Sequence, residues 1–528
     1  MTTPTTTPYR SRQQTGRDGF AQLLRAEWTK FRTVRGWVIG MLVAALVTVL
    51  LGLLTSAGRH CSTIGPAGPA GPALACSSPV GPGGAAVSDS FYFVHQPLAG
   101  NGSITVRVTA LTGLYSTNSH QGSSTSMKPG LQPWAKAGIL IKENTRQGSA
   151  YAAIMVTGGH GVRMQYDYTN DTAGRLGAVS AASPRWLRLT RSGDTITGYE
   201  SADDTHWTRV GTATLAGLSS TVQAGLFAAS PPYTQVVSQS LGTVTGTGGP
   251  TLATAAFDHV SLQGERPSGG WSGEDIGAEY LAPSGGFHQA GAAFTVTGTG
   301  DIAPAVPGGA SPATPIETTL IGAFAGLIAV IVVATMFMTA EYRRGLIRIT
   351  LAASPRRSRV LAAKAIVVGA VTFVAGLTAS AVTVPLGERL LRDNGNFIAP
   401  VTPLTELRVV AGTAALLAVA AVFALAVGAL LRRSAGAVSA VIAAIVLPYI
   451  LATTSVLPAG PADWLLRVTP AAAFAIQQST PQYPQVSNAY TPFNGYFPLA
   501  PWAGLAVLCA WAALALALAA FLLRRREA

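Results

Sequence analysis

The segment EYRRGLIRITLAASPRRSRVLAAK (residues 341–364) carries the densest group of side chains that could make a functional contact. It holds six arginines and Lys364 but a single acid, Glu341. So many positive side chains could bind anionic headgroups or orient neighbouring membrane helices. The apolar side chains among them could instead dock on a partner protein. The contact candidates are Glu341, Arg343, Arg344, Gly345, Leu346, Ile347, Ile349, Pro355, Arg356 and Arg357.

Local signals predict how this segment folds. A helix that continues past the membrane would end near Glu341, and the chain would turn near Gly345. A short helix over residues 346–353 would follow and stop at Pro355, because proline cannot extend a helix. The apolar side chains would then lie on a compact element between two longer helices.

Composition indicates what surrounds the segment. Hydrophobic residues make up 48% of the 528 residues and charged residues only 11%, and the mean hydropathy is +0.36. These values are too apolar for an ordinary soluble protein. Six apolar stretches each approach the ~20 residues that cross a bilayer as a helix. They cover residues 37–56, 316–340, 361–386, 407–431, 435–457 and 501–523, so we predict a multi-pass membrane protein with six transmembrane helices.

Lysine and arginine lie at alternate ends of these stretches, and short basic loops mark the cytoplasmic side of a membrane. Basic residues precede the first stretch and follow the second, fourth and sixth. We therefore expect both termini to be cytoplasmic and residues 57–315 to be extracytoplasmic, in a bacterial plasma membrane. Lipid headgroups, not nucleic acid, account for the net charge of +13. No apolar core precedes residue 37, so the first helix is not a cleaved signal peptide.

The insertion between the first two helices has a different period. Residues 57–87 are rich in glycine and proline and predict a linker. Over residues 88–302 apolar and polar residues alternate in short runs such as KAGILIKE (136–143), which predicts half-buried antiparallel strands. The expected product is an all-β sandwich, and a linker over residues 303–315 would join it to the second helix.

Cys61 and Cys76 flank the glycine- and proline-rich part of the first linker. On the oxidising side of a membrane they could form a disulfide that closes a loop of ~15 residues and contributes about 3 kcal/mol. Two free thiols in a mobile linker are the alternative. Cys509 lies in the last apolar stretch, where cysteine behaves as a small apolar residue.

Three stretches of the insertion, DSFYFVHQPLAGNGSITVRV, WAKAGILIKEN and WLRLTRSGDTITGYESADDTHWTRVG, resemble concanavalin A-like jelly-roll domains of the laminin-G and lectin/glucanase superfamily. Residues 275–302 resemble a part that precedes the first of these strands in such domains. We expect this segment to pair back onto the sandwich, as in a circular permutation; a fragment of a second sandwich is the alternative. Such domains often bind sugars, and Trp134, Trp186 and Trp207 could stack on a sugar ring, although tryptophan on an alternating strand is more often core.

Residues suited to catalysis are weakly arranged in the insertion. Glu200, Asp203 and Asp204 could supply the two carboxylates of a glycosidase, which must face each other across a cleft. Neighbouring aspartates are, however, typical of a turn. None of the seven histidines has the spacing of a metal site. We expect no catalytic residue and no metal site in this chain.

The rest of the chain resembles the permease subunit of a type-2, export-type ABC transporter. The resemblance rests on LLRAEWTKFRTVRGW, the basic segment, LPAGPADWLLRVTPAAAFAIQQS and the last apolar stretch. It implies an amphipathic interfacial helix within residues 1–36, helices two to six within residues 316–528, and re-entrant outer helices over residues 458–500. Two such halves pair, and a separate ATPase docks on the coupling segment 341–364, where Glu341 would pair with an arginine of the partner or of the loop.

The sequence contains no G-x-x-x-x-G-K-[ST] motif, so ATP and Mg²⁺ would bind to the partner ATPase and this chain would hold no cofactor. Two functions remain open. The first is a permease subunit that carries an extracytoplasmic sandwich. The second is a membrane-anchored binding or sensing protein whose permease-like part does not transport. The predicted helices contain no distinctive polar site that would indicate a transported substrate.

Overall fold

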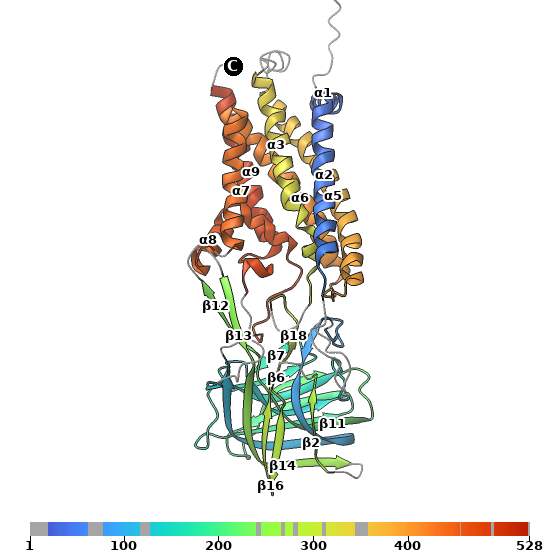
Figure 1. Ribbon diagram of the computed structural model, residues 1–528, viewed down its shortest axis with the longest axis vertical. Coiled ribbons are helices and arrows are strands. Elements are labelled where there is room, and N and C mark those ends of the chain that lie inside the picture. The colour runs from blue at the N-terminus through green and yellow to red at the C-terminus, as the bar shows by residue number, and fades with distance from the viewer. Residues whose placement is uncertain are drawn as a thin grey trace, which may run out of the picture.

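The computed structural model of the chain describes residues 19–61, 76, 78–116, 127–238, 244–265, 270–277, 283–308, 313–343, 357–454, 456–486 and 490–525. A helical bundle forms one end and a β-sandwich the other (Figure 1). Six helices in the described residues are long and apolar enough to cross a membrane: α2 (Arg35–Gly58), α3 (Gly322–Arg343), α5 (Arg357–Asp393), α6 (Pro403–Leu431), α7 (Ser434–Thr453) and α9 (Pro501–Arg525). We call the two ends of the bundle the sandwich end and the distal end.

Each predicted apolar stretch corresponds to one of these helices, with two differences. The second stretch begins as a 3₁₀ turn, η1 (Ile316–Leu320), and its α-helix starts only at Gly322. The third is longer than predicted, because α5 spans 37 residues. Arginine, glutamate and leucine at the ends of α5 favour helix formation. A prediction from hydropathy leaves the charged residues out of the apolar stretch, so it made this helix too short.

Shorter helices lie at both ends of the bundle. α1 (Phe20–Thr33) is at the distal end, where Figure 1 also places the C-terminus. α8 (Ala459–Val468), η2 (Pro470–Gln477) and η3 (Pro492–Asn494) follow α7 at the sandwich end. They occupy the region that the sequence predicted to hold re-entrant helices.

The sandwich consists of two antiparallel layers that share one long strand, β2 (Phe91–Tyr115). The first layer has the order β15–β2–β11–β4–β5–β6–β7, and the second has the order β10–β9–β8–β2–β14–β17–β16. The main apolar core lies between them. Their other strands are β4 (Lys136–Lys142), β5 (Tyr151–Thr157), β6 (Val162–Tyr166), β7 (Asn170–Ala173), β8 (Arg185–Ser192), β9 (Thr195–Ser201), β10 (Thr208–Thr214), β11 (Thr221–Ala229), β14 (Thr251–Glu265), β15 (Ser272–Ile276), β16 (Gly286–Ala290) and β17 (Ala293–Gly298). β3 (Lys128–Pro129) pairs antiparallel with the end of β2, and β12 (Tyr233–Ser238) and β13 (Val244–Gly249) form a separate hairpin.

The segment 275–302 belongs to this same sandwich. β17 pairs with β14 in a register that runs from Ala253 opposite Gly298 to Phe257 opposite Phe294. Phe294 and Val296 contribute to the main core. The segment therefore pairs back onto the sandwich as predicted, and it is not a fragment of a second one.

The outer surface of the first layer is covered by the chain's own linkers. β1 (Val87–Asp89) pairs with β18 (Ile302–Pro304), and this two-stranded ribbon packs over β4. Lys142 Nζ lies 2.8 Å from Asp89 Oδ2, and Lys136 Nζ lies 2.6 Å from Asp301 Oδ1; both lysines are completely buried. The prediction that KAGILIKE is half-buried is therefore wrong, because the ribbon supplies carboxylates that match the two lysines.

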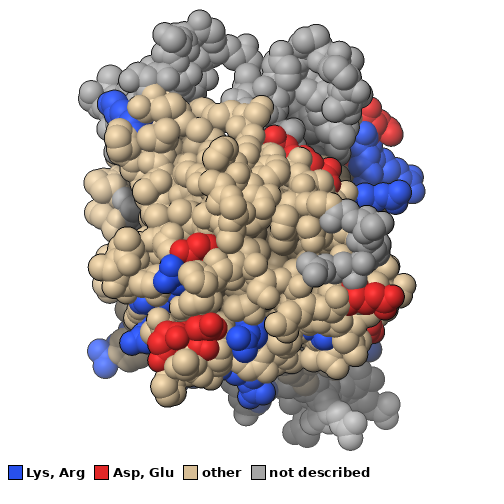
Figure 2. Space-filling model, turned by 90° about the horizontal axis from the view of Figure 1, so that it is seen from below, with Lys and Arg blue, Asp and Glu red and all other residues tan. Residues whose placement is uncertain are grey.

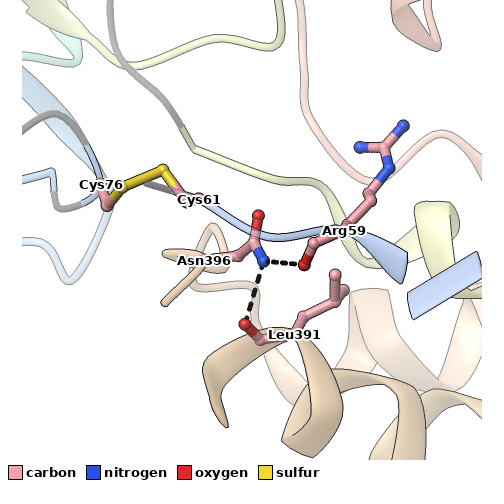
Figure 3. The surroundings of a disulfide bond; sticks show 5 residues. All are labelled: Arg59, Cys61, Cys76, Leu391 and Asn396. Atoms are coloured by element: carbon pink, nitrogen blue, oxygen red, sulfur yellow. Dashed lines mark hydrogen bonds between the residues drawn. A yellow bond between two sulfur atoms is a disulfide. The ribbon is translucent and has the colours of Figure 1, made fainter. Parts of the chain in front are cut away.

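A disulfide joins Cys61 and Cys76, whose Cα atoms are 5.8 Å apart (Figure 3). The connection between α5 and α6 holds the adjacent end of α2. Asn396 Nδ2 donates to the carbonyl oxygen of Arg59 at 2.8 Å, and the Cys61 N–H donates to that of Asn394 at 3.1 Å. These hydrogen bonds hold Cys61 at the bundle, and the disulfide keeps Cys76 next to it.

Candidate functional site

Four charged side chains from three helices meet at the distal end of the bundle. Lys364 of α5 donates to Glu27 Oε2 of α1 and to Glu341 Oε1 of α3, each at 2.6 Å. Lys30 of α1 lies 2.9 Å from Glu27 Oε1 and 3.2 Å from Glu341 Oε1. We call Glu27, Lys30, Glu341 and Lys364 the charge cluster. It contains two acids and two bases, so its formal charges balance.

Aromatic packing shields the charge cluster from solvent at Lys364 and Glu27, whereas Lys30 is 42% exposed. The side chain of Lys364 is 0% exposed and that of Glu27 only 1%. The Lys364 ammonium lies 4.8 Å from the centre of the Phe337 ring, within the range of a cation–π contact. Phe31 of α1 packs edge-on against Phe337 at 5.6 Å. Burial makes the two ionic contacts of Lys364 difficult to break without a replacement partner.

The charge cluster stands at the base of the basic segment. α3 ends at Arg343 and α5 begins at Arg357, so the connection between them joins the two helices that supply Glu341 and Lys364. Arg343 is exposed, and Arg357 Nη1 donates to the carbonyl oxygen of Leu523 on α9 at 2.6 Å. The remaining predicted contact residues, Arg344, Gly345, Leu346, Ile347, Ile349, Pro355 and Arg356, and the predicted helix over residues 346–353, lie outside the described residues.

Within the described residues, Glu341 forms ion pairs with Lys364 and Lys30. The arginines expected to pair with it belong to residues 344–356 or to a partner protein, so that expectation stays a prediction. Sequence reasoning missed Glu27 as a functional residue, although it is the only acid in the otherwise basic α1. Lys364 was also missed as a buried partner, although it interrupts the apolar run VLAAKAIVV. A single charged residue among apolar residues of a helix could have indicated a buried ion pair.

The three candidate tryptophans do not share one site. Trp134 precedes β4, is 6% exposed, and stacks on His160 with ring centres 3.9 Å apart. Trp186 lies in β8 of the second layer, with the Arg107 guanidinium 5.7 Å from its ring. Trp207 precedes β10 and stacks under the Arg188 guanidinium at 3.8 Å. Each ring already has a partner within the chain.

The carboxylates that could suggest glycoside hydrolysis serve the backbone instead. Glu200 is buried and accepts a hydrogen bond from the Arg175 N–H at 2.7 Å. Asp203 accepts from the N–H groups of Thr205 and His206, each at 2.9 Å, in the turn after β9. These contacts hold the pKa of Asp203 well below its usual range, with the His206 backbone contact the largest cause. The described residues include no group of His, Cys, Asp and Glu that could hold a metal ion.

Charge on the sandwich face that points away from the bundle is mixed. Figure 2 shows acidic and basic side chains next to each other on a largely uncharged surface. Binding of a polyanion such as nucleic acid requires an extended basic field. This face does not provide one.

Six membrane-length helices and the inserted sandwich define a multi-pass membrane protein. Residues 146–528 match the sequence model of the family described as "ABC-2 family transporter protein". The match covers more than half of the chain, so the chain belongs to this family. Membership makes it a transport subunit of the membrane, not an enzyme.

No curated protein matches the chain. Among solved structures, a functionally unknown protein from Saccharomyces cerevisiae is similar at 19% identity, over 34% of this chain and 77% of that one, with a TM-score of 0.21. Scytalido-glutamic peptidase is similar at 10% identity, over 40% and 98%, with a TM-score of 0.25. A GH43 protein from Bacillus licheniformis is similar at 14% identity, over 28% and 26%, with a TM-score of 0.16. Likenesses of this size carry no argument about fold or activity.

Proposed function

We propose that the chain is the membrane-spanning permease subunit of an ABC exporter, driven by a separate ATPase subunit that binds ATP and Mg²⁺. Family membership and a sequence without a phosphate-binding motif support this division of roles. The observation that carries the proposal is the charge cluster at the base of the connection between α3 and α5. A docking element needs a rigid base if it is to transmit force, and buried ion pairs from three helices supply one.

The charge cluster suggests how movement would spread. A force on residues 344–356 reaches α3 at Arg343 and α5 at Arg357, which bound the segment. Glu27 ties both helices to α1 through Lys364. Separating these buried charges costs more than moving the helices together. We infer that α1, α3 and α5 move as one unit when the ATPase changes state.

A second permease half completes the proposed transporter. α2 and α9 bury only 22% and 28% of their most apolar windows within the chain. Their remaining apolar surface, which includes Leu46, Leu54, Trp502 and Leu518, faces either the lipid bilayer or the second half. The alternative function, a sensing protein on a non-transporting anchor, predicts no associated ATPase.

The proposed topology places the sandwich outside the cell, in a bacterial plasma membrane, and the distal end of the bundle in the cytoplasm. Single cysteines at Ser219 and Ser434, in a chain whose Cys509 is replaced by serine, test this placement. Ser219 lies in the sandwich and Ser434 begins α7 at the distal end. In intact cells an impermeant thiol reagent should label position 219 and spare position 434. Labelling of position 434 alone would show that the topology is the reverse of the one proposed.

The docking role of the basic segment is tested by the double change Ile347→Ser and Ile349→Ser. It leaves every positive charge in place, so insertion and orientation should stay normal, as labelling at position 434 can verify. Each buried aliphatic side chain that is lost should weaken docking by ~1–3 kcal/mol. We therefore expect less ATPase to co-purify with the double variant than with the parent chain. If equal amounts of ATPase co-purified with both chains, the segment would serve only to orient the neighbouring helices.

A further inference from the structure

The sandwich meets the bundle at a junction of three segments. η1 leads from the sandwich into α3, β18 is the last strand before it, and residues 478–486 and 490–497 connect η2 to α9. We call the two parts of this connection the junction loop. Val486 and Tyr496 of the loop pack with Ala303 and Val306 in one buried apolar cluster. Gln485 Nε2 also donates to the carbonyl oxygen of Thr169, next to β7, at 3.2 Å.

A carboxyl group lies inside this junction. Glu317 Oε1 in η1 accepts a hydrogen bond from the Ser479 N–H at 3.2 Å. Three further polar atoms around it, Glu317 Oε2, Ser479 Oγ and Tyr496 Oη, are buried and have no hydrogen-bond partner among the described residues. Ser479 is 8% exposed and Tyr496 only 2%. Gly495 closes the site, since a Cβ there would lie 3.3 Å from Glu317 Oε1.

The charged groups near Glu317 do not neutralise it. The positive charge of Arg408 on α6 acts on the carboxyl, but its Nη2 donates to the carbonyl oxygen of Gln478 at 2.7 Å. Its Nη1 donates to that of Ile476 at 3.4 Å. On the junction loop the titratable groups are phenols: Tyr483, Tyr490 and Tyr496.

The other helices packed against η1 add no counter-charge. Ser56 of α2 and Thr383 of α5 lie close to Thr319 of η1, and both are uncharged. Glu388 and Arg392 of α5 pair with each other at 2.7 Å. Asp301, beside β18, pairs with Lys136. Glu317 is the only acid among the described residues of η1, β18 and the junction loop, and it has no ion pair within 4.0 Å.

Ionisation of this carboxyl conflicts with the packing. A buried carboxylate with one hydrogen bond is unfavourable, because burial without partners removes its hydration. Glu317 is half-buried as a residue, and water would hydrate its buried Oε2 if the junction loop moved away from η1. Arg408 could approach it only by giving up its bonds to Ile476 and Gln478, which hold the start of the same loop. Either response loosens the loop and, through Tyr496, the contact with β18.

We propose that Glu317 is the proton-binding centre of a latch that docks the sandwich on the bundle. With Glu317 protonated, the carboxyl is neutral and tolerates burial with its one hydrogen bond from the Ser479 N–H, and the junction loop stays packed. With Glu317 ionised, the junction loop separates from η1 and the sandwich is released from its contacts at Tyr496 and Gln485. The latch therefore couples extracytoplasmic pH to the position of the sandwich.

The direction of the response follows from burial. Burial raises the pKa of the Glu317 carboxyl above its ordinary value, although the hydrogen bond from the Ser479 N–H and the charge of Arg408 oppose this. A carboxyl whose pKa is higher in the docked state than in the released state binds a proton more tightly when docked. Docking is therefore fully favoured at low pH and is lost as pH rises through the raised pKa.

Spin labels on the full chain would measure this movement. With Cys509 replaced by serine, labels at Ser219 in the sandwich and at Val456, exposed between α7 and α8, report the sandwich-to-bundle distance. Between about pH 4 and about pH 9 a narrow distance distribution should give way to a broader and longer one. A distribution that does not change over this range would overturn the proposal without any substitution at Glu317.

Three variants test whether Glu317 causes the change of the distance distribution with pH. Glu317→Gln keeps the size but cannot ionise, so its distribution should stay narrow throughout. Glu317→Asp retains a carboxyl and should retain the shift. Glu406→Gln is the matched control, because Glu406 is exposed at the sandwich end of α6, and it should shift like the parent chain. A shift that persists in Glu317→Gln would assign the response to another group, such as a histidine of the sandwich, and would contradict the proposal.

Discussion

Replacement of Lys364 by methionine is expected to destabilise the helical bundle by about 3–5 kcal/mol, because it leaves buried acids without their central counter-charge. Lys364 Nζ is 2.6 Å from an oxygen of both Glu27 and Glu341. The partly exposed Lys30 also contacts both acids but cannot fill the buried position. Thermal unfolding of the full chain in detergent measures the loss. Co-purification of the ATPase should fall with it.

Two controls separate the buried charge from charge in general. Arg359→Met removes a positive charge from an exposed position near the start of α5 and should change stability little. Adding Glu27→Gln and Glu341→Gln to Lys364→Met removes the unpaired acids and should recover part of the loss, a non-additive result expected of residues in one network. If Lys364→Met were as stable as Arg359→Met, the charge cluster would not hold the three helices together.

Asp89→Ala should cost about 3–5 kcal/mol in the sandwich for the same reason. Asp89 Oδ2 accepts from Lys142 at 2.8 Å, from the Gly148 N–H at 2.8 Å and from the Tyr168 hydroxyl at 2.7 Å. The substitution leaves Lys142 buried and separates β1 from β4. Unfolding of the sandwich, followed by the near-ultraviolet signal of its aromatic residues, measures the effect.

The Asp89→Ala variant should also become less stable as pH falls. Burial lowers the pKa of the Lys142 amine, and Asp89 opposes that shift in the parent chain. Without Asp89 the folded state binds the proton more weakly than the unfolded state, so stability decreases at lower pH. Asp204→Asn is the control, since Asp204 is 43% exposed and only 3.7 Å from Arg188. An exposed pair contributes ~1 kcal/mol or less.

The pattern of apolar residues in the sequence predicted the helices and strands better than it predicted which side chains are buried. The apolar stretches gave all six long helices, and the alternating run 136–143 gave β4. Alternation also predicted that this strand would be half-buried, but even Lys136 and Lys142 are completely buried. Their partners Asp301 and Asp89 lie 165 and 53 residues away, and no local pattern reveals a pairing over such separations.

The charge cluster shows the same limit of sequence reasoning. Hydropathy located the basic segment and drew attention to Glu341, yet its partners are 23 residues away at Lys364 and 311 away at Lys30. The bond between Lys364 and Glu27 spans 337 residues. Which basic side chain enters the bundle depends on how α1 packs against α5, and packing geometry is not encoded in a single helix. The same holds for Glu317, whose surroundings come from η1, α6 and the junction loop.

We propose that this chain works as a permease driven by another subunit. The most direct measurement is ATP hydrolysis by the chain purified from its own host membranes in mild detergent. We predict that an ATPase with a phosphate-binding motif co-elutes, that the complex hydrolyses ATP, and that Ile347→Ser with Ile349→Ser removes both. An intact, folded chain that elutes without ATP hydrolysis, while its sandwich still binds a ligand, would contradict the account and favour a membrane-anchored sensor.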